Sequence, residues 1–175
     1  MSFNSTLSIG LLFIASLAYA QEETASGDFV RLIAPLDEPE YYCLDLAGWG
    51  DHLQLDDPLQ THTCKIRGGG DQMFFFEDNR LKVDGFDRCV QLAGSSGVTL
   101  LGSSVLARPC SDSPLQNLTI DEDGYIHIGD SDYCLGTGSE SAEAAGPSHM
   151  WRTLVAVHCS TTPAERVTWQ VGLAE

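Results

Sequence analysis

Six cysteines at near-regular intervals constrain this chain more than any other feature of its sequence. They are Cys43, Cys64, Cys89, Cys110, Cys134 and Cys159. Taken alternately, they are separated by 46 and 45 residues in one set and by 46 and 49 in the other. A near-constant period of about 45 residues, carried by two landmarks at once, is typical of an internal repeat. The spacing predicts three repeats with two cysteines each.

Other segments recur with the cysteines. Residues 78–83 (DNRLKV) begin 11 residues before Cys89, and residues 123–128 (DGYIHI) begin 11 residues before Cys134. Each combines a turn, with Asn79-Arg80 and Asp123-Gly124 as hairpin candidates, and a strand that alternates polar and apolar residues. The residues ten positions after the second cysteine are large and apolar, and we expect them in equivalent core positions: Phe74, Ile120 and Trp169.

These landmarks predict an all-β domain. Between them the chain is rich in Gly, Ser, Asp and Pro and has short runs of strand-forming residues, without an amphipathic helix of three turns. We expect about four strands per repeat, twelve in total, with repeats at about 28–77, 78–122 and 123–172. One repeat cannot bury its own apolar face, so the three must close around a shared core.

The first twenty residues have the pattern of an export signal. The apolar run 7–17 precedes Ala18-Tyr19-Ala20, a small-x-small cleavage site, although residues 1–10 carry no Lys or Arg. The run is shorter than the roughly 20 apolar residues that span a bilayer. We predict a signal peptide at 1–20, a mature domain at 21–175, secretion, and no membrane insertion.

An exported chain with an even number of cysteines is expected to form disulfides. Six cysteines allow fifteen connectivities, and the repeats favour pairing within each: Cys43–Cys64, Cys89–Cys110 and Cys134–Cys159. Each bridge should contribute about 3 kcal/mol in the chain-entropy model. Pairing every cysteine leaves no thiolate for zinc, and we predict no metal site.

Charge and motifs narrow the function. The formal net charge is −16, from 25 acidic and 9 basic residues, which disfavours nucleic acid and anionic surfaces and favours neutral ligands, cationic partners or simply solubility. The sequence lacks a nucleophile elbow, a His-Glu-x-x-His motif, a P-loop and a dinucleotide fingerprint. We predict that the protein is not an enzyme and needs no cofactor.

The motifs of the first repeat resemble those of the ricin-B-type (R-type) lectins. It reads Cys43-Leu44-Asp45, then Gln60-Thr61-His62-Thr63-Cys64, then Asp71-Gln72-Met73-Phe74. The family signature is Cys-Leu-Asp, then Gln-x-aromatic-x-Cys, then Asn/Asp-Gln-x-Trp, in the same order. The resemblance covers residues 28–172 and implies a β-trefoil fold and carbohydrate binding.

The resemblance also implies roles for individual residues. Asp45 would accept hydrogen bonds from two neighbouring sugar hydroxyls, Asp71 would hold another hydroxyl, and Gln72 would support Asp45 or reach the sugar. His62 matches the stacking aromatic residue, and Gln60 is the polar position two residues earlier. These residue types suit a pyranose, because its hydroxyls can donate hydrogen bonds to a carboxylate and its C–H face can pack against an aromatic ring.

Two tryptophans outside the signature could add a ring. Trp49 lies in the loop after Asp45 and could supply the stacking surface if the ring of His62 is too small. Trp151 falls in an insertion of the third repeat, at residues 146–152, where it could be exposed. We therefore include Trp49 in the predicted site and leave the role of Trp151 open.

The second and third repeats depart from the signature. The Asp45 position is Gln91 and then Gly136, and the His62 position is Arg108 and then Val157. By spacing from the second cysteine, Asn117 matches Asp71, and Leu118 and Val167 replace Gln72. The resemblance thus predicts one working site, in the first repeat.

Two functions follow from this pattern. The first is a secreted lectin for galactose-type or related neutral sugars, with glycans or glycoproteins as partners. The alternative is a trefoil whose sugar site has degenerated and which binds a protein partner, as a secreted inhibitor or toxin subunit.

Overall fold

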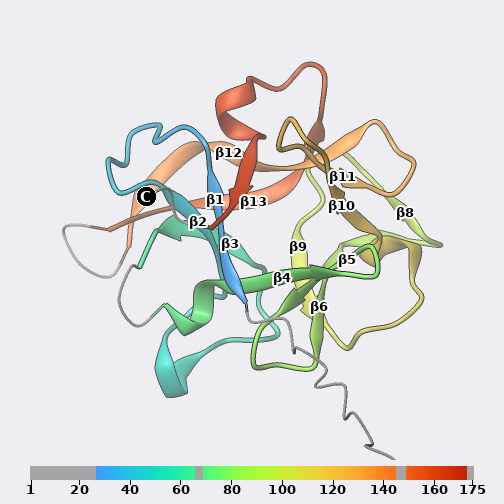
Figure 1. Cartoon of the computed structure of the whole chain (residues 1–175), viewed down its shortest axis with the longest axis horizontal. Helices are drawn as coiled ribbons and strands as arrows, with labels where there is room; N and C mark the ends of the chain where they lie inside the picture. The colour runs from blue at the N-terminus through green and yellow to red at the C-terminus, as the bar shows by residue number, and fades with distance from the viewer. Residues whose placement is uncertain (1–26, 66–68, 145–148, 173–175) are drawn as a thin grey trace, which may run out of the picture.

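The computed structural model describes residues 27–65, 69–144 and 149–172 (Figure 1). The predicted signal peptide at 1–20 lies outside the described residues. In the described part, the strands pair antiparallel and the helical segments are short 3-10 turns, so the prediction of an all-β fold is confirmed. Among these residues, no helix has the length and apolar character that a membrane crossing would need.

Twelve strands form one sheet system and fall into three sets of four. The first set is β1 (Asp28–Leu32), β2 (Tyr42–Asp45), β3 (Gln60–Thr63) and β4 (Met73–Glu77). The second is β5 (Arg80–Val83), β6 (Arg88–Leu92), β9 (Val105–Arg108) and β10 (Leu118–Ile120). The third is β11 (Ile126–Ile128), β12 (Tyr133–Glu143), β13 (Met150–His158) and β14 (Trp169–Val171).

Shorter elements join these strands. A small hairpin of β7 (Gly94–Ser95) and β8 (Val98–Thr99) lies within the second set. The 3-10 turns are η1 (Gly50–His52), η2 (Gly70–Gln72), η3 (Pro114–Gln116) and η4 (Ala164–Arg166). The last three each precede the fourth strand of their set.

The pairing of the strands closes the chain on itself. The fourth strand of each set pairs with the first strand of the next, as β4 with β5 and β10 with β11. The last strand, β14, pairs back with β1 and places Trp169 opposite Leu32. The described chain thereby begins and ends in adjacent strands, and closure leaves fewer unpaired strand edges.

The turn between β4 and β5 shows how local sequence fixes the register. Asp78 and Asn79 have φ values of 51° and 55°, and Glu77 pairs with Arg80. Two successive positive φ values define a two-residue type I′ hairpin, which suits the twist of the strands. The turn is centred one residue earlier than the predicted Asn79-Arg80, and Asp and Asn tolerate this conformation.

The three predicted disulfides are present. Cys43–Cys64, Cys89–Cys110 and Cys134–Cys159 have Cα–Cα distances of 5.0, 4.9 and 5.1 Å. Each bridge links the second strand of its set to the residues just after the third strand. His127 lies close to the last bridge, and the three side chains could geometrically hold a metal ion, but both sulfurs there are committed to a disulfide.

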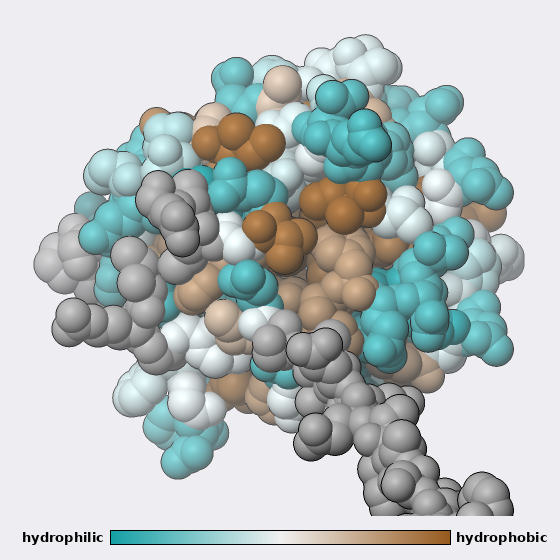
Figure 2. Space-filling model, in the orientation of Figure 1, coloured by the Kyte–Doolittle hydropathy of each residue, from teal (hydrophilic) through white to brown (hydrophobic). Residues whose placement is uncertain are grey.

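A single large core lies between the three sets. Phe74, Leu118 and Trp169 are buried in it at corresponding places, since they pair with Val83, Ile128 and Leu32. The prediction of Ile120 as the second-set counterpart is wrong, because Ile120 lies two residues further along β10 and is only partly buried. Figure 2 shows apolar side chains gathered at the centre of one face, with hydrophilic side chains around them.

A shorter loop in the second set explains this difference. Gln72 ends η2 eight residues after Cys64, whereas Gln116 ends η3 six residues after Cys110. Counting from the cysteine therefore shifts the alignment by two residues. Gln116 corresponds to Gln72, which corrects the predicted matches of Leu118 to Gln72 and of Asn117 to Asp71.

Candidate functional site

The predicted site residues lie on strands β2 and β3, next to β13 of the third set. β12 and β13 have 11 and 9 residues, whereas β2 and β3 have 4 each. The long hairpin reaches the first set and pairs β13 with β3. The registers define one cross-strand row of Cys43, His62 and Trp151 and a second row of Asp45, Gln60 and Thr153.

A cavity of about 540 Å³ opens beside these rows. Gln60, His62 and Trp49, three of the six predicted site residues, line it, together with Gly48 and Lys65. The β12–β13 hairpin supplies the rest of its described lining: Glu143, Ala144, His149 and Trp151. The site therefore combines the first set with a segment about ninety residues further along the chain.

The other three predicted residues, Asp45, Asp71 and Gln72, are buried. Asp45 has no exposed surface. Its Oδ1 accepts a hydrogen bond of 2.8 Å from Gln60 Nε2, and its Oδ2 accepts one of 2.9 Å from Gln72 Nε2. In this arrangement Asp45 holds Gln60, which itself lines the cavity. Direct contact between Asp45 and a sugar stays a prediction.

Gln72 organises the loop that follows the disulfide. Its Oε1 accepts a hydrogen bond of 2.7 Å from the backbone N–H of Lys65, and its Nε2 also donates to the Thr63 carbonyl at 3.1 Å. Gln72 thus ties the end of β3 to Asp45, which agrees with the supporting role that the resemblance implied for it.

Sequence reasoning missed Lys65, as well as Glu143 and His149 of the hairpin. Lys65 Nζ lies 2.8 Å from Asp45 Oδ2 and also bonds to the Asp71 carboxylate, and the Lys65 side chain is 20% exposed. Its place directly after Cys64, between the two recognised motifs, was the only available signal. One ammonium group thereby joins both predicted acidic residues and lines the cavity above them.

Burial and charge act in opposite directions on this cluster. Burial raises the pKa of Asp45, while Lys65 and Gln60 pull that pKa down. The pKa of Lys65 is raised, because Asp45 and Asp71 outweigh the effect of its own burial. Two carboxylates and one ammonium group carry a net charge of −1, and Glu143 on the rim adds another negative charge. A neutral ligand fits this electrostatic balance better than an anion does.

Aromatic rings from the first set and from the hairpin line the cavity. The rings of His62 and His149 have centroids 5.5 Å apart, and His62 Nδ1 lies 3.0 Å from the Thr63 carbonyl oxygen. His62 is only 8% exposed, whereas Trp151 is partly exposed and Trp49 is 69% exposed. Trp151 and Trp49 therefore offer more accessible ring surface than the predicted stacking residue, His62.

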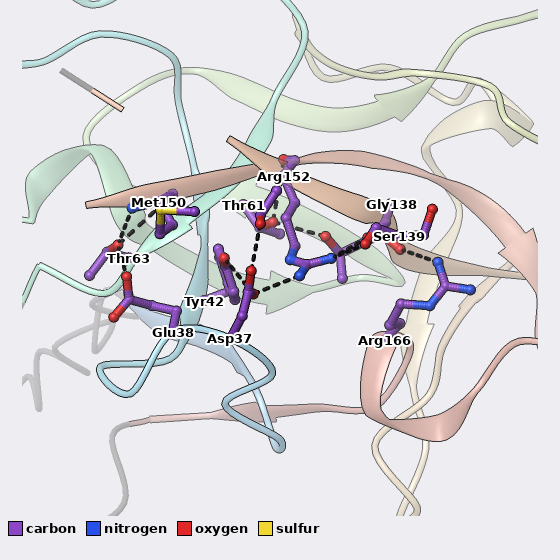
Figure 3. A network of polar contacts seen from close by, with 12 residues as sticks. Asp37, Glu38, Tyr42, Thr61, Thr63, Gly138, Ser139, Met150, Arg152 and Arg166 are labelled. Atoms are coloured by element: carbon purple, nitrogen blue, oxygen red, sulfur yellow. Dashed lines mark hydrogen bonds and ion pairs between the residues drawn. The ribbon is translucent and has the colours of Figure 1, made fainter. Parts of the chain in front are cut away.

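A polar network holds the hairpin against the first set (Figure 3). Arg152 Nη2 donates to Asp37 Oδ1 at 2.6 Å, and Arg152 Nη1 donates to the carbonyls of Gly138 and Ser139 at 3.0 and 2.6 Å. Tyr42 donates to the same carboxylate at 3.0 Å. Although burial opposes it, the hydrogen bonds to Asp37 hold its pKa far below the ordinary value.

Buried hydroxyls extend this network behind β3. Thr61 and Thr137 form a side-chain hydrogen bond of 3.0 Å, and Thr63 donates to Glu38 at 2.8 Å while accepting from the Met150 N–H at 2.8 Å. These bonds join β3 to both strands of the hairpin. The two chain neighbours of Trp151, Met150 and Arg152, are thus hydrogen-bonded to Thr63 and Asp37 of the first set, and these bonds hold Trp151 in position.

The corresponding places in the other sets lack the charged cluster. In the second set, Gln116 Nε2 donates to Gln91 Oε1 at 2.9 Å, and Gln116 Oε1 accepts from the Ser111 N–H at 2.8 Å. Gln116 thus makes the same pattern of hydrogen bonds as Gln72, but its side-chain partner is the neutral Gln91 in place of Asp45. In the third set, Gly136 pairs with Val155, and an added Cβ there would meet Val157 at 2.5 Å.

Comparisons with known proteins give the fold. No model of a known protein family matches the chain, and no curated protein sequence matches it significantly. Among solved structures, the C-half of an earthworm R-type lectin in complex with GalNAc matches 85% of this chain and 98% of its own, with a TM-score of 0.58 and 9% identity. The Vibrio vulnificus hemolysin/cytolysin β-trefoil lectin, with N-acetyl-D-lactosamine bound, matches 87% and 98%, with a TM-score of 0.54 and 17% identity. The fold is a β-trefoil.

A third match agrees with the arrangement of the strands. A designed threefold-symmetric protein, ThreeFoil, matches 83% of this chain and 99% of its own, with a TM-score of 0.53 and 16% identity. The resemblance to R-type lectins that the motifs indicated is thus matched by a similarity in three dimensions over most of the trefoil. At these identities the similarity establishes the fold, and the function rests on the site.

Proposed function

We propose that this trefoil is a secreted lectin that binds neutral, galactose-type or related sugars in the cavity beside β2, β3 and β13, without catalysing a reaction. The observation that carries the proposal is the lining of this cavity, where Gln60 and Lys65 stand beside the rings of His62 and Trp151. Amide and ammonium groups suit sugar hydroxyls, and rings suit the C–H face of a pyranose.

The buried acids support the cavity in this proposal. Asp45 holds both the amide of Gln60 and the ammonium of Lys65, so these groups are positioned before a ligand arrives. Preorganised polar groups cost less free energy on binding than mobile ones. A sugar hydroxyl would meet Gln60 and Lys65 first, and contact with Asp45 or Asp71 would require Lys65 to move aside.

The similar solved structures and the disulfides support the same reading. Two of the similar structures contain GalNAc and N-acetyl-D-lactosamine. Three disulfides are typical of exported proteins. Because the second and third sets lack the acid and the ammonium, we propose one sugar site per chain, and cross-linking of glycans would need an oligomer.

A glycan array with the mature protein tests the proposal. We expect binding to neutral galactose-type glycans, weakened about tenfold by Gln60→Ala, which removes one hydrogen bond worth about 1.4 kcal/mol, and further weakened by Trp151→Ala. Gln54→Ala is the matched control, because Gln54 is exposed and outside the cavity lining. Absence of binding to any neutral glycan by the folded protein, or binding insensitive to both variants, would refute the proposal.

Protein binding is the second candidate function. It is favoured by an exposed apolar segment formed by Val98 of β8 and by Leu100 and Leu101 just after this strand, which are 59%, 66% and 58% exposed. Saturable binding to a deglycosylated cell-surface protein, lost on Leu100→Ser with Leu101→Ser, would support this candidate. Binding that needs the glycan would exclude it.

A further inference from the structure

A second cavity adjoins the proposed sugar site. Its volume is about 330 Å³, and it shares two lining residues, Gln60 and Trp151, with the first cavity. Ala47 lines the second cavity and its chain neighbour Gly48 lines the first. The two cavities therefore meet along Gln60 and Trp151.

The register of the strands explains why these two residues serve both cavities. Gln60 pairs with Thr153, and its neighbour in the next row, His62, pairs with Trp151. Side chains two residues apart on a strand point to the same face. Trp151 and Thr153 thus stand side by side on one face of β13, the former bordering both cavities and the latter bordering only the second of them.

The lining of the second cavity matches another sugar ring. Accessible apolar surface comes from Pro58 and Val155, and hydroxyl groups come from Ser104 and Thr153. In the described lining, Asp57 is the one charged side chain of this cavity. Apolar surface suits sugar C–H groups, hydroxyl and carboxylate groups suit sugar hydroxyls, and a lining without a cation disfavours an acidic sugar.

We infer that the ligand is a neutral oligosaccharide of at least two sugar units that spans both cavities, with Trp151 and Gln60 at the junction. This inference rests on the proposed function, since it extends the same site. A terminal sugar occupies the first cavity and the next unit lies over the second. The long hairpin of the third set is what creates this extended groove, because it supplies Trp151 together with Thr153, Leu154 and Val155.

Isothermal titration of the full mature protein tests this inference. The probes are galactose and GalNAc as single sugars, and N-acetyllactosamine with a longer neutral oligosaccharide as extended ligands. We expect an extended ligand to bind at least tenfold more tightly than its terminal sugar. Ser104→Phe, which fills the second cavity but leaves the first lining intact, should remove that gain and leave single-sugar binding unchanged. Ser160→Phe, at an exposed turn residue outside both cavities, is the control and should change neither.

The outcomes separate the inference from the proposed function. Single-sugar binding without a gain for extended ligands, or a gain that survives Ser104→Phe, overturns the second subsite while the lectin proposal stands. Thr153→Trp provides an independent test from the other side of the groove, with the same expected loss. If neither single nor extended sugars bind the folded protein, both the proposed function and this inference fail.

Discussion

Replacing Asp45 with alanine should destabilise the fold by about 3 kcal/mol. The side chain has no exposed surface and accepts hydrogen bonds from Gln60, Gln72 and Lys65 at 2.8, 2.9 and 2.8 Å. Removing one partner of a buried ion pair costs about 3–5 kcal/mol. We take the lower end because Lys65 keeps Asp71 and Gln72 keeps the Thr63 carbonyl.

The corresponding residue of the second set provides a matched control. Gln91 accepts one neutral hydrogen bond, from Gln116, which also bonds to the Pro109 carbonyl. Gln91→Ala should therefore cost only about 1 kcal/mol. For a domain of this size, 1 kcal/mol shifts Tm by about 2–4 °C, so the two variants should differ by about 4–8 °C.

Thermal and guanidinium unfolding, followed by circular dichroism with the disulfides intact, measure this difference. Equal losses for Asp45→Ala and Gln91→Ala would refute the reasoning, because the charged cluster would then stabilise the fold no more than its neutral counterpart.

Three further predictions concern acidity, the hairpin and the tryptophans. On acidification Asp45, whose pKa is raised by burial, should take up its proton before Asp37, whose pKa is lowered. The contribution of Asp37 to stability is present above the ordinary aspartate pKa and is lost as the pH falls from that value through the lowered pKa of the folded state. Ionisation of Asp45, in contrast, opposes folding as the pH rises through its raised pKa. Carboxyl ¹³C NMR would show this order, and the reverse order would contradict it. Arg152→Met should cost about 2 kcal/mol by removing the bonds to Asp37 and two carbonyls, and faster amide exchange in β12 and β13 would report it; unchanged exchange would count against the network. Trp169→Ala should cost about 3–5 kcal/mol, because Trp169 fills the core, whereas Trp49→Ala should stay within about 0.5 kcal/mol, as guanidinium unfolding would show.

The fold could be predicted because its information repeats along the chain. Cysteine spacing, two-residue alternation and turn residues each depend on neighbouring positions, and these gave the all-β class, the number of main strands and the three disulfides. The same counting failed in the second set, where a loop shorter by two residues moved Leu118 into the place expected for Ile120. A shorter loop changes the number of residues between the cysteine and the strand without changing the polar and apolar pattern of the segments on either side.

The candidate site depended far more on the tertiary structure. The signature residues of the first set did lie together, since β2, β3 and the following loop are close in sequence. The approach of β13 to β3 was not visible in any local pattern, because it depends on contacts such as Thr63 with Met150 and Asp37 with Arg152, which are 87 and 115 residues apart.

Sequence alone thus determined the strands, their covalent links and the acids, amides and rings of the first set. Only the closed fold decided that Lys65 bonds to both acids, that Asp45 is buried, and that Trp151 forms a wall of the cavity. The physical reason is that strand and turn propensities act between neighbours, whereas burial and ion pairing depend on which distant segments the closure brings together.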